Sequence, residues 1–213
     1  MGYQRDLFMR VRLVAFAMLV SAMVFSGPAV AGERYISAFG FSMEVPANWL
    51  AVTPAEIREN PQLFGQIADE VPGVDQTVIN EIRQAISAGN MEIYYDLGAE
   101  VEVFADNISV TTSVGQVPRG GEELQEVCGE IQLVYRQYFE PPLHVYECRA
   151  AGVDGRSAVF VEAESPMQGA RSLQYMFPKS ESIMVALTGT FKEDRLEAQR
   201  RVFDGIVQSI RLE

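Results

Sequence analysis

Apolar and polar residues alternate over short segments near the start of the chain and through its second half, which predicts β-strands. The segments 143–151 and 156–164 flank Asp154-Gly155, a pair typical of the tight turn of a β-hairpin. The predicted strands are 34–39, 41–45, 49–52, 91–95, 100–104, 107–113, 143–151, 156–164, 172–177 and 183–191. Short strands separated by turn residues indicate an antiparallel sheet.

Segments with apolar residues at helical spacing lie between and after these strands. Proline and glycine divide the segment 54–88 into two or three short helices, which end at Gly89-Asn90. The chain closes with a helix that carries Leu196, Phe203, Ile206 and Ile210 on one face. The order of elements predicts an α+β domain in which helices pack on an antiparallel β-sheet.

A long central helix is predicted between Gly120-Gly121 and Pro141-Pro142. Glu122 and Glu123 lie in its first turn, where the helix dipole favours negative charge. Its apolar residues recur three or four positions apart and form one stripe, made of Leu124, Val127, Cys128, Ile131, Val134, Tyr135 and Tyr138.

Residues 1–31 have the three-part layout of a secretory signal peptide. Three arginines precede an apolar run from Leu13 to Phe25, and Ala29-Val30-Ala31 stands before Gly32. This run is shorter than the roughly 20 residues that a membrane-spanning helix needs. We therefore expect cleavage after Ala31 rather than an uncleaved anchor. Residues 32–213 should then form a single domain in the bacterial periplasm, with secretion from the cell as the alternative.

The charge balance narrows the classes of partner. The chain has 29 acidic residues against 17 lysines and arginines, a net charge of −12. Such an acidic surface disfavours nucleic acid and anionic lipid headgroups as partners. Because no segment after the leader is apolar enough to span a membrane, we expect no stable membrane insertion once the leader is removed.

Two cysteines, Cys128 and Cys148, occur in the chain. An even number in an exported protein favours a disulfide, here between the central helix and the strand that follows it. Two separate buried thiols are the alternative. The spacing excludes a C-x-x-C redox pair.

Candidate catalytic and metal-binding residues are few. The only histidine, His144, is interpreted as a strand or core residue rather than part of a catalytic triad. Glycine motifs for phosphate binding and the G-x-S-x-G and H-E-x-x-H patterns are absent from the sequence. We therefore predict no catalytic residue, no cofactor and no metal site.

Clustered carboxylates are the strongest argument against that prediction. Asp96, Glu100, Glu102 and Asp106 lie close together in the sequence and offer the oxygen ligands that calcium prefers. Their spacing fits no calcium-binding loop, so a solvated strand edge is the preferred interpretation. The same holds for Asp69, Glu70 and Asp75 around Pro72-Gly73.

Three stretches resemble PsbP-like domains. The segment 41–49 has a short apolar strand followed by Pro46, two residues and Trp49. The segment 107–110 precedes a helix after a glycine-rich break, and 183–190 precedes the last helix, as in those domains. The chain is thus similar to the PsbP-like and Mog-type superfamily, which includes bacterial DcrB-like envelope proteins. The resemblance implies an α-β-α sandwich and a non-enzymatic role in binding other proteins, with no catalytic residues to carry over.

We therefore expect an exported binding or accessory protein that contacts an envelope protein. A carrier of a small ligand or divalent cation is one alternative, and a hydrolase-type enzyme with a carboxylate-based site is another. The segment 54–88 is expected to carry partner specificity, or else to form a fixed lid over the core. The candidate partner-binding residues are Trp49, Phe64, Ile67, Ile79 and Ile82. Trp49 has a second interpretation, in which it covers one end of the core.

Overall fold

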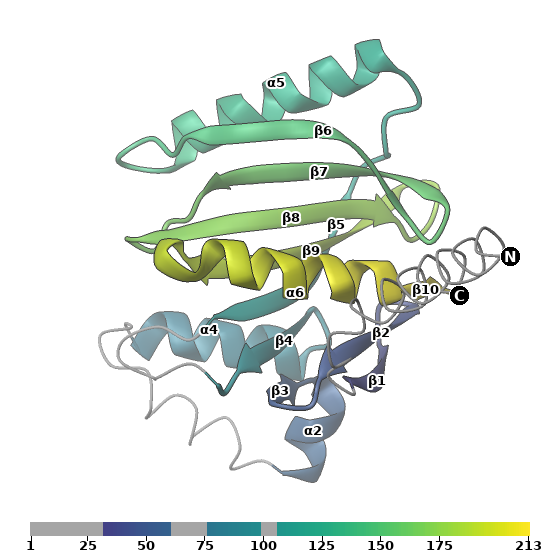
Figure 1. The fold of residues 1–213 in the computed structure, drawn as a ribbon, viewed down its shortest axis with the longest axis vertical. Coiled ribbons are helices and arrows are strands. Elements are labelled where there is room, and N and C mark those ends of the chain that lie inside the picture. The colour runs from purple at the N-terminus through teal and green to yellow at the C-terminus, as the bar shows by residue number, and fades with distance from the viewer. Residues whose placement is uncertain (1–31, 61–75, 99–105) are drawn as a thin grey trace, which may run out of the picture. The chain divides into compact units, whose positions relative to one another are not determined.

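The computed structural model describes residues 32–60, 76–98 and 106–213, and Gly32–Glu213 form one compact unit (Figure 1). Its strands form two antiparallel sheets. The three-stranded sheet has the order β1 (Gly32–Ser37), β2 (Phe41–Pro46) and β10 (Arg211–Leu212). The seven-stranded sheet has the order β3 (Trp49–Val52), β4 (Met91–Asp96), β5 (Asn107–Val114), β9 (Ile183–Lys192), β8 (Ala170–Pro178), β7 (Arg156–Glu164) and β6 (Val145–Val153).

The described helices are α2 (Pro54–Glu59), α4 (Gln76–Ser87), α5 (Gly121–Tyr138) and α6 (Leu196–Ser209), with a short 3₁₀ turn η1 (Glu193–Arg195) before α6. Figure 1 shows α6 lying across the seven-stranded sheet and α5 running along β6. The predicted α+β class, an antiparallel sheet flanked by helices, is confirmed. No helix in the described ranges is both long and apolar enough to cross a membrane.

The hairpin between β6 and β7 forms as the sequence predicts. Asp154 and Gly155 both have positive φ angles, 47° and 75°, which suit a tight turn that follows the twist of the strands. The preceding strand begins at Val145 and not at Leu143, because the N–H of Leu143 bonds to the carbonyl of Tyr135 at the end of α5. The predicted strand 100–104 lies outside the described residues.

Successive residues of a strand point to opposite faces of the sheet, so the register assigns each side chain to a face. The face covered by α6 and the three-stranded sheet holds the main core. Phe41 and Met43 of β2 belong to this core together with Phe203 of α6 and Ile210, the residue that follows α6. The strands contribute large, fully buried side chains to this core, namely Tyr94, Ile108, Phe160, Leu173, Phe177, Leu187 and Phe191.

The opposite face carries α4 and α5 in two separate clusters. Ile86 of α4 packs on Val52 and Ile93, whereas α5 packs on Val159, Val161 and Ala163 of β7. A single cross-strand row connects the two clusters and is polar in its middle, since it runs Ile93, Ser109, Thr188, Gln174, Val161 and Cys148. In this row Gln174 donates a hydrogen bond to the Thr188 hydroxyl over 2.8 Å.

A buried carboxylate joins the two sheets. Glu92 of β4 is 1% exposed and accepts hydrogen bonds from the Ser37 hydroxyl, the Ala38 N–H and the Tyr94 hydroxyl, over 2.8, 2.8 and 3.0 Å. Burial and the neighbouring Glu92 raise the pKa of Tyr94, so its hydroxyl remains a donor. Since Ser37 ends β1 and Ala38 begins the turn to β2, this carboxylate fixes the β1–β2 hairpin against the larger sheet.

Helix α5 is attached to the sheet differently from α6. It has no buried residue, although Leu124, Ile131 and Tyr135 pack on the β7 cluster. The predicted disulfide is present and links half-buried Cys128 of α5 to Cys148 of β6, with their Cα atoms 5.8 Å apart. The bond therefore supplements a small apolar contact at the sheet edge.

We expect the disulfide to contribute about 3 kcal/mol to stability, because it closes a short loop and restricts the unfolded chain. The double variant Cys128→Ser/Cys148→Ser should lose this amount in guanidinium denaturation. Dithiothreitol should lower the stability of the unaltered protein to the same level and leave the double variant unchanged. Two alkylatable thiols in protein purified without reductant would contradict the bond.

Candidate functional site

A depression lies where α5 runs into β6. This hollow has a volume of about 620 Å³ and opens between the α5–β6 connection, the β7–β8 loop and η1. Its lining residues are Phe139, Glu140, Pro141, Leu143, Glu164, Ser165, Pro166, Met167, Gln168, Gly169, Ala170 and Glu193. Ligand sites commonly have volumes of about 300–1,000 Å³, so the size suits a binding role.

The β7–β8 loop forms a hydrogen-bonded wall of the hollow. The N–H of Ser165 bonds to the carbonyl of Ala170 over 3.2 Å, and the N–H of Ala170 bonds to the carbonyl of Met167 over 3.1 Å. Gly169 has a φ of 74°, which only glycine adopts without strain, and its carbonyl accepts the N–H of Glu193 over 3.0 Å. The loop is thereby tied to η1.

Glu164, at the end of β7, holds the segment that leads into β6. Its carboxylate accepts the backbone N–H of His144 over 2.9 Å and the Tyr146 hydroxyl over 3.2 Å. The N–H of Glu164 in turn bonds to the carbonyl of His144 over 2.8 Å. The hydrogen bond from the His144 backbone is the main reason that the pKa of Glu164 is lowered, and Tyr146 acts in the same direction. Glu164 is therefore ionised at neutral pH.

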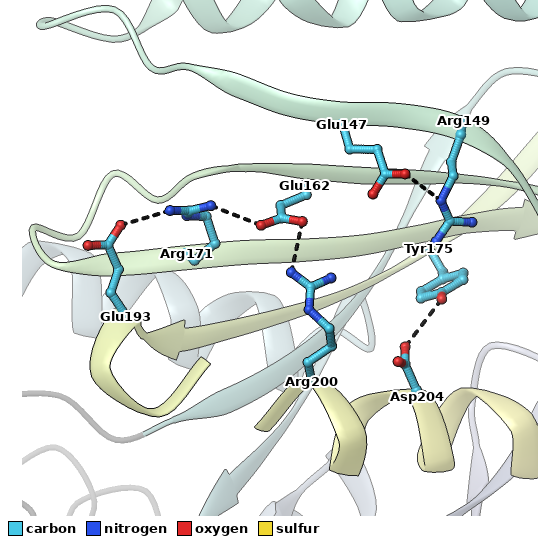
Figure 2. A network of polar contacts seen from close by, with 8 residues as sticks. All are labelled: Glu147, Arg149, Glu162, Arg171, Tyr175, Glu193, Arg200 and Asp204. Carbon is cyan, nitrogen blue, oxygen red and sulfur yellow. Dashed lines mark hydrogen bonds and ion pairs between the residues drawn. The ribbon is translucent and has the colours of Figure 1, made fainter. Parts of the chain in front are cut away.

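A network of ion pairs continues from the rim of the hollow to α6 (Figure 2). Arg171 of β8 bonds to Glu193 over 3.2 Å and to Glu162 of β7 over 2.9 Å. Glu162 also pairs with Arg200 of α6 over 2.8 Å. The guanidinium of Arg171 stacks 3.7 Å from the ring centre of Tyr146. The network connects β7 and β8 to α6. Every charged group in it has an internal partner, so none of these side chains is a free acid or base.

Two further pairs extend the polar surface along the sheet. Arg149 of β6 bonds to Glu147 over 2.8 Å and lies 4.4 Å from the ring centre of Phe160. The Tyr175 hydroxyl donates to Asp204 of α6 over 3.4 Å (Figure 2).

Asp96 and Asp106 do not lie at a solvated strand edge, so the prediction was wrong for these two carboxylates. Asp96 is 7% exposed and accepts hydrogen bonds from Asn48, Gly98 and Gln199. These internal donors hold the carboxylate in place of water.

Asp106 is completely buried and pairs with Arg195 over 2.6 Å. Burial raises the pKa of Asp106, while the Lys192 N–H and Arg195 oppose that rise. Glu100, Glu102, Asp69, Glu70 and Asp75 lie outside the described residues. Within the described ranges, no three histidine, cysteine or acidic side chains are grouped to hold a metal ion.

His144 is neither a core nor a strand residue, contrary to the prediction. It is exposed, directly precedes β6, and packs its ring edge-on against Tyr146 with 4.6 Å between ring centres. Its backbone groups, rather than its imidazole, contribute to the wall of the hollow.

The candidate partner-binding residues have different environments. Trp49 is 5% exposed and belongs to the main core, and Ile82 of α4 is half-buried against the cluster of Ile86. Phe64, Ile67 and the side chain of Ile79 lie outside the described residues. The two candidates whose side chains are described, Trp49 and Ile82, therefore belong to different clusters.

The apolar stripe of α5 is wider than its contact with the sheet. Leu133, Val134 and Tyr138 are 52%, 46% and 78% exposed. Val134 and Tyr138 are one helical turn apart and share a flank of α5, which we call the α5 flank. Tyr138 is followed directly by Phe139, which is a lining residue of the hollow. The periodicity indicated the stripe but not which part of it faces solvent.

Comparison with solved structures identifies the architecture. PsbP of the cyanobacterium Synechocystis sp. PCC 6803 (CyanoP), known from a solution structure, aligns over 90% of this chain and 99% of its own, with 16% identity and a TM-score of 0.51. The fold is PsbP-like. No protein-family model and no curated sequence matches the chain.

Two other solved structures align with lower scores. LpqN of Mycobacterium tuberculosis, described as involved in cell envelope biogenesis, covers 87% of this chain and 86% of its own, with 13% identity and a TM-score of 0.47. The Ran-binding protein Mog1p of Saccharomyces cerevisiae covers 85% and 96%, with 8% identity and a TM-score of 0.42. At these identities the likeness concerns the PsbP-like fold alone, as it does for the cyanobacterial protein.

The hydrogen bond from Tyr146 gives a test of the wall of the hollow. Because the Tyr146 hydroxyl stabilises the ionised form of Glu164, Tyr146→Phe should raise the pKa of Glu164 toward its ordinary value. Carboxyl carbon chemical shifts followed by NMR over pH 2–7 would measure it. Tyr138→Phe, which alters an exposed tyrosine with no such bond, is the control. An unchanged pKa in Tyr146→Phe would contradict the contact.

Proposed function

We propose that this chain is an exported, non-enzymatic binding or accessory protein that acts through protein–protein contacts in the bacterial periplasm. The partner in this proposal is a protein of the cell envelope. Nucleic acid is not a partner, and the domain is not inserted in the membrane once its leader is removed.

The leader supports export. Its basic start, short apolar run and Ala29-Val30-Ala31 ending fit a cleavable signal peptide, which makes residues 32–213 the mature domain. The Cys128–Cys148 disulfide fits the same location, because disulfides persist in oxidising compartments such as the periplasm.

The state of the ionisable side chains supports a role without catalysis. A catalytic acid or base needs access to substrate, whereas Glu92, Asp96 and Asp106 are buried and hydrogen-bonded within the protein. Glu162 accepts hydrogen bonds from two arginines. Cys128 is bridged to Cys148, and a bridged sulfur is no nucleophile for the sole histidine to activate.

The observation that carries the proposal is the α5 flank. A helix of 18 residues with no buried residue presents Val134 and Tyr138 to solvent beside a preformed hollow. Exposed aromatic and aliphatic side chains next to a depression are the usual anchors of protein interfaces. The hollow also suits the alternative of a small-ligand carrier, which would bury its ligand there without needing the α5 flank.

Export predicts a defined amino terminus. We expect the mature protein isolated from the periplasm of the native cell to begin at Gly32, as measured by intact-mass and peptide mass spectrometry. Ala31→Phe should block this processing, because signal peptidase requires small residues at the cleavage site. Gly27→Ala, which leaves the cleavage site intact, is the control. A protein retaining Met1 in the envelope fraction would contradict cleavage.

The α5 flank can be tested by partner capture. Val134→Ser/Tyr138→Ser should reduce the envelope protein that co-purifies by about tenfold or more, because truncating an interface anchor commonly costs upwards of 1–2 kcal/mol. Val114→Ser/Ile183→Ser is the matched control, since Val114 and Ile183 are an exposed apolar pair on β5 and β9. Equal capture by both double variants, with unchanged melting temperatures, would contradict the proposal.

A further inference from the structure

We propose that the hollow at the carboxyl end of α5 receives an extended segment of the partner polypeptide through a lysine or arginine side chain. This inference rests on the proposed function and names the chemistry of the partner. It assigns a binding role to residues that the sequence pattern did not single out.

The lining of the hollow is negatively charged. Three glutamates line the hollow, and its lining includes no lysine, arginine or histidine. Glu193 forms an ion pair with Arg171, whereas Glu164 accepts hydrogen bonds from a backbone N–H and a hydroxyl and feels Arg171 only at longer range. Glu140 is exposed and forms no ion pair or hydrogen bond with the described part of the chain. Arg136 lines a separate, smaller depression with His144.

The carboxyl end of α5 adds to the negative charge at the hollow. The carboxyl end of a helix has a partial negative charge, because the last carbonyl groups have no partner within the helix. Helix α5 ends at Tyr138, directly before lining residues Phe139 and Glu140. Two carboxylates and a helix carboxyl terminus therefore favour a cation at the same place.

The hollow also has an apolar surface. Phe139, Leu143 and Met167 offer a surface on which the aliphatic part of a lysine or arginine side chain can lie, with its charged end at the glutamates. The hydrogen bonds of the β7–β8 loop order this surface before binding, so little entropy is lost on binding. Tyr138 is 78% exposed and directly precedes Phe139, the first lining residue of the hollow, so the α5 flank and the hollow are consecutive along the chain.

Fluorescence anisotropy with a labelled peptide of six alternating leucines and lysines tests the inference, using the protein exported and processed by the cell. We expect this peptide to bind, a peptide with glutamate in place of lysine not to bind, and the affinity to fall when salt is raised from about 0.1 to about 1 M. Glu140→Gln/Glu164→Gln should weaken binding roughly tenfold, since each exposed charge pair is worth about two- to fivefold.

Glu122→Gln/Glu126→Gln is the matched control, because it removes two exposed carboxylates of α5 at least about 18 Å from its carboxyl end. It should leave the affinity unchanged. Glu140→Gln alone should weaken binding two- to fivefold and tests the hollow even if the change at Glu164 disturbs folding. Equal losses in the control and hollow variants, or equal binding of the lysine and glutamate peptides, would overturn the inference.

Spermidine distinguishes a polypeptide from a small polyamine. If spermidine binds as tightly as the peptide and displaces it, the occupant is a polyamine and the inference is wrong. A different result would contradict the proposed function, namely unchanged partner capture by Val134→Ser/Tyr138→Ser. If instead capture depends on the α5 flank while Glu140→Gln/Glu164→Gln has no effect on either capture or peptide binding, only the assignment of the hollow is overturned.

Discussion

The seven-stranded sheet buries its two faces unequally, and the positions of the helices follow from this asymmetry. Aromatic side chains of alternate residues, among them Phe160, Phe177 and Phe191, point to the face covered by α6. Burial of such large side chains is the dominant favourable contribution to folding. Gly189 makes close packing there feasible, since a Cβ at this position would lie 3.2 Å from the ring of Phe203 and collide with Phe191. The main core therefore forms around α6.

The opposite face has less to bury, and it is polar between its two ends. Where α5 packs, the buried residues are the small side chains Val159, Val161 and Ala163 of β7, and the neighbouring strands add half-buried Val145, Cys148 and Met176. This surface contacts one side of the apolar stripe, and the other side, with Val134 and Tyr138, is exposed. The disulfide to Cys148 compensates for the limited contact, because a covalent link stabilises without requiring more apolar surface. A helix fixed in this manner keeps its place on the sheet while Val134 and Tyr138 stay exposed.

Carboxylates have two distinct roles in this acidic protein. Glu92 and Asp106 are buried, and each replaces its lost hydration with hydrogen bonds that connect elements distant in the sequence. Removing one donor from such a site leaves a buried charge without compensation, which makes these residues structural. Glu140 and Glu164 lie at the surface, where ionisation costs little and the negative charge acts on the surroundings. Sequence position alone does not separate the two roles, because both kinds of residue occur in or next to strands.

Sequence reasoning succeeded where a local pattern determines the structure. The alternation in 156–164 and the apolar run 49–52 gave the bounds of β7 and β3, since each strand is defined by its own residues and the turns beside it. The spacing in α5 predicted a helix but not its exposed flank, because periodicity does not show how much apolar surface the opposing strands offer. Asp106 was misassigned for the same reason, since its partner Arg195 comes from a distant turn.

The hollow illustrates why a site built from several connections escapes such reasoning. Its three glutamates belong to the α5–β6 connection, the end of β7 and η1, and only the antiparallel pairing of β6, β7 and β8 brings these ends together. The available signals were indirect, namely Pro141-Pro142 after the helix and the turn residues between Glu164 and Ala170. They mark loops at one edge of the sheet without showing that the loops face each other. The charge of a surface is thus a property of topology as much as of composition, and here the topology places three glutamates together at the carboxyl end of α5.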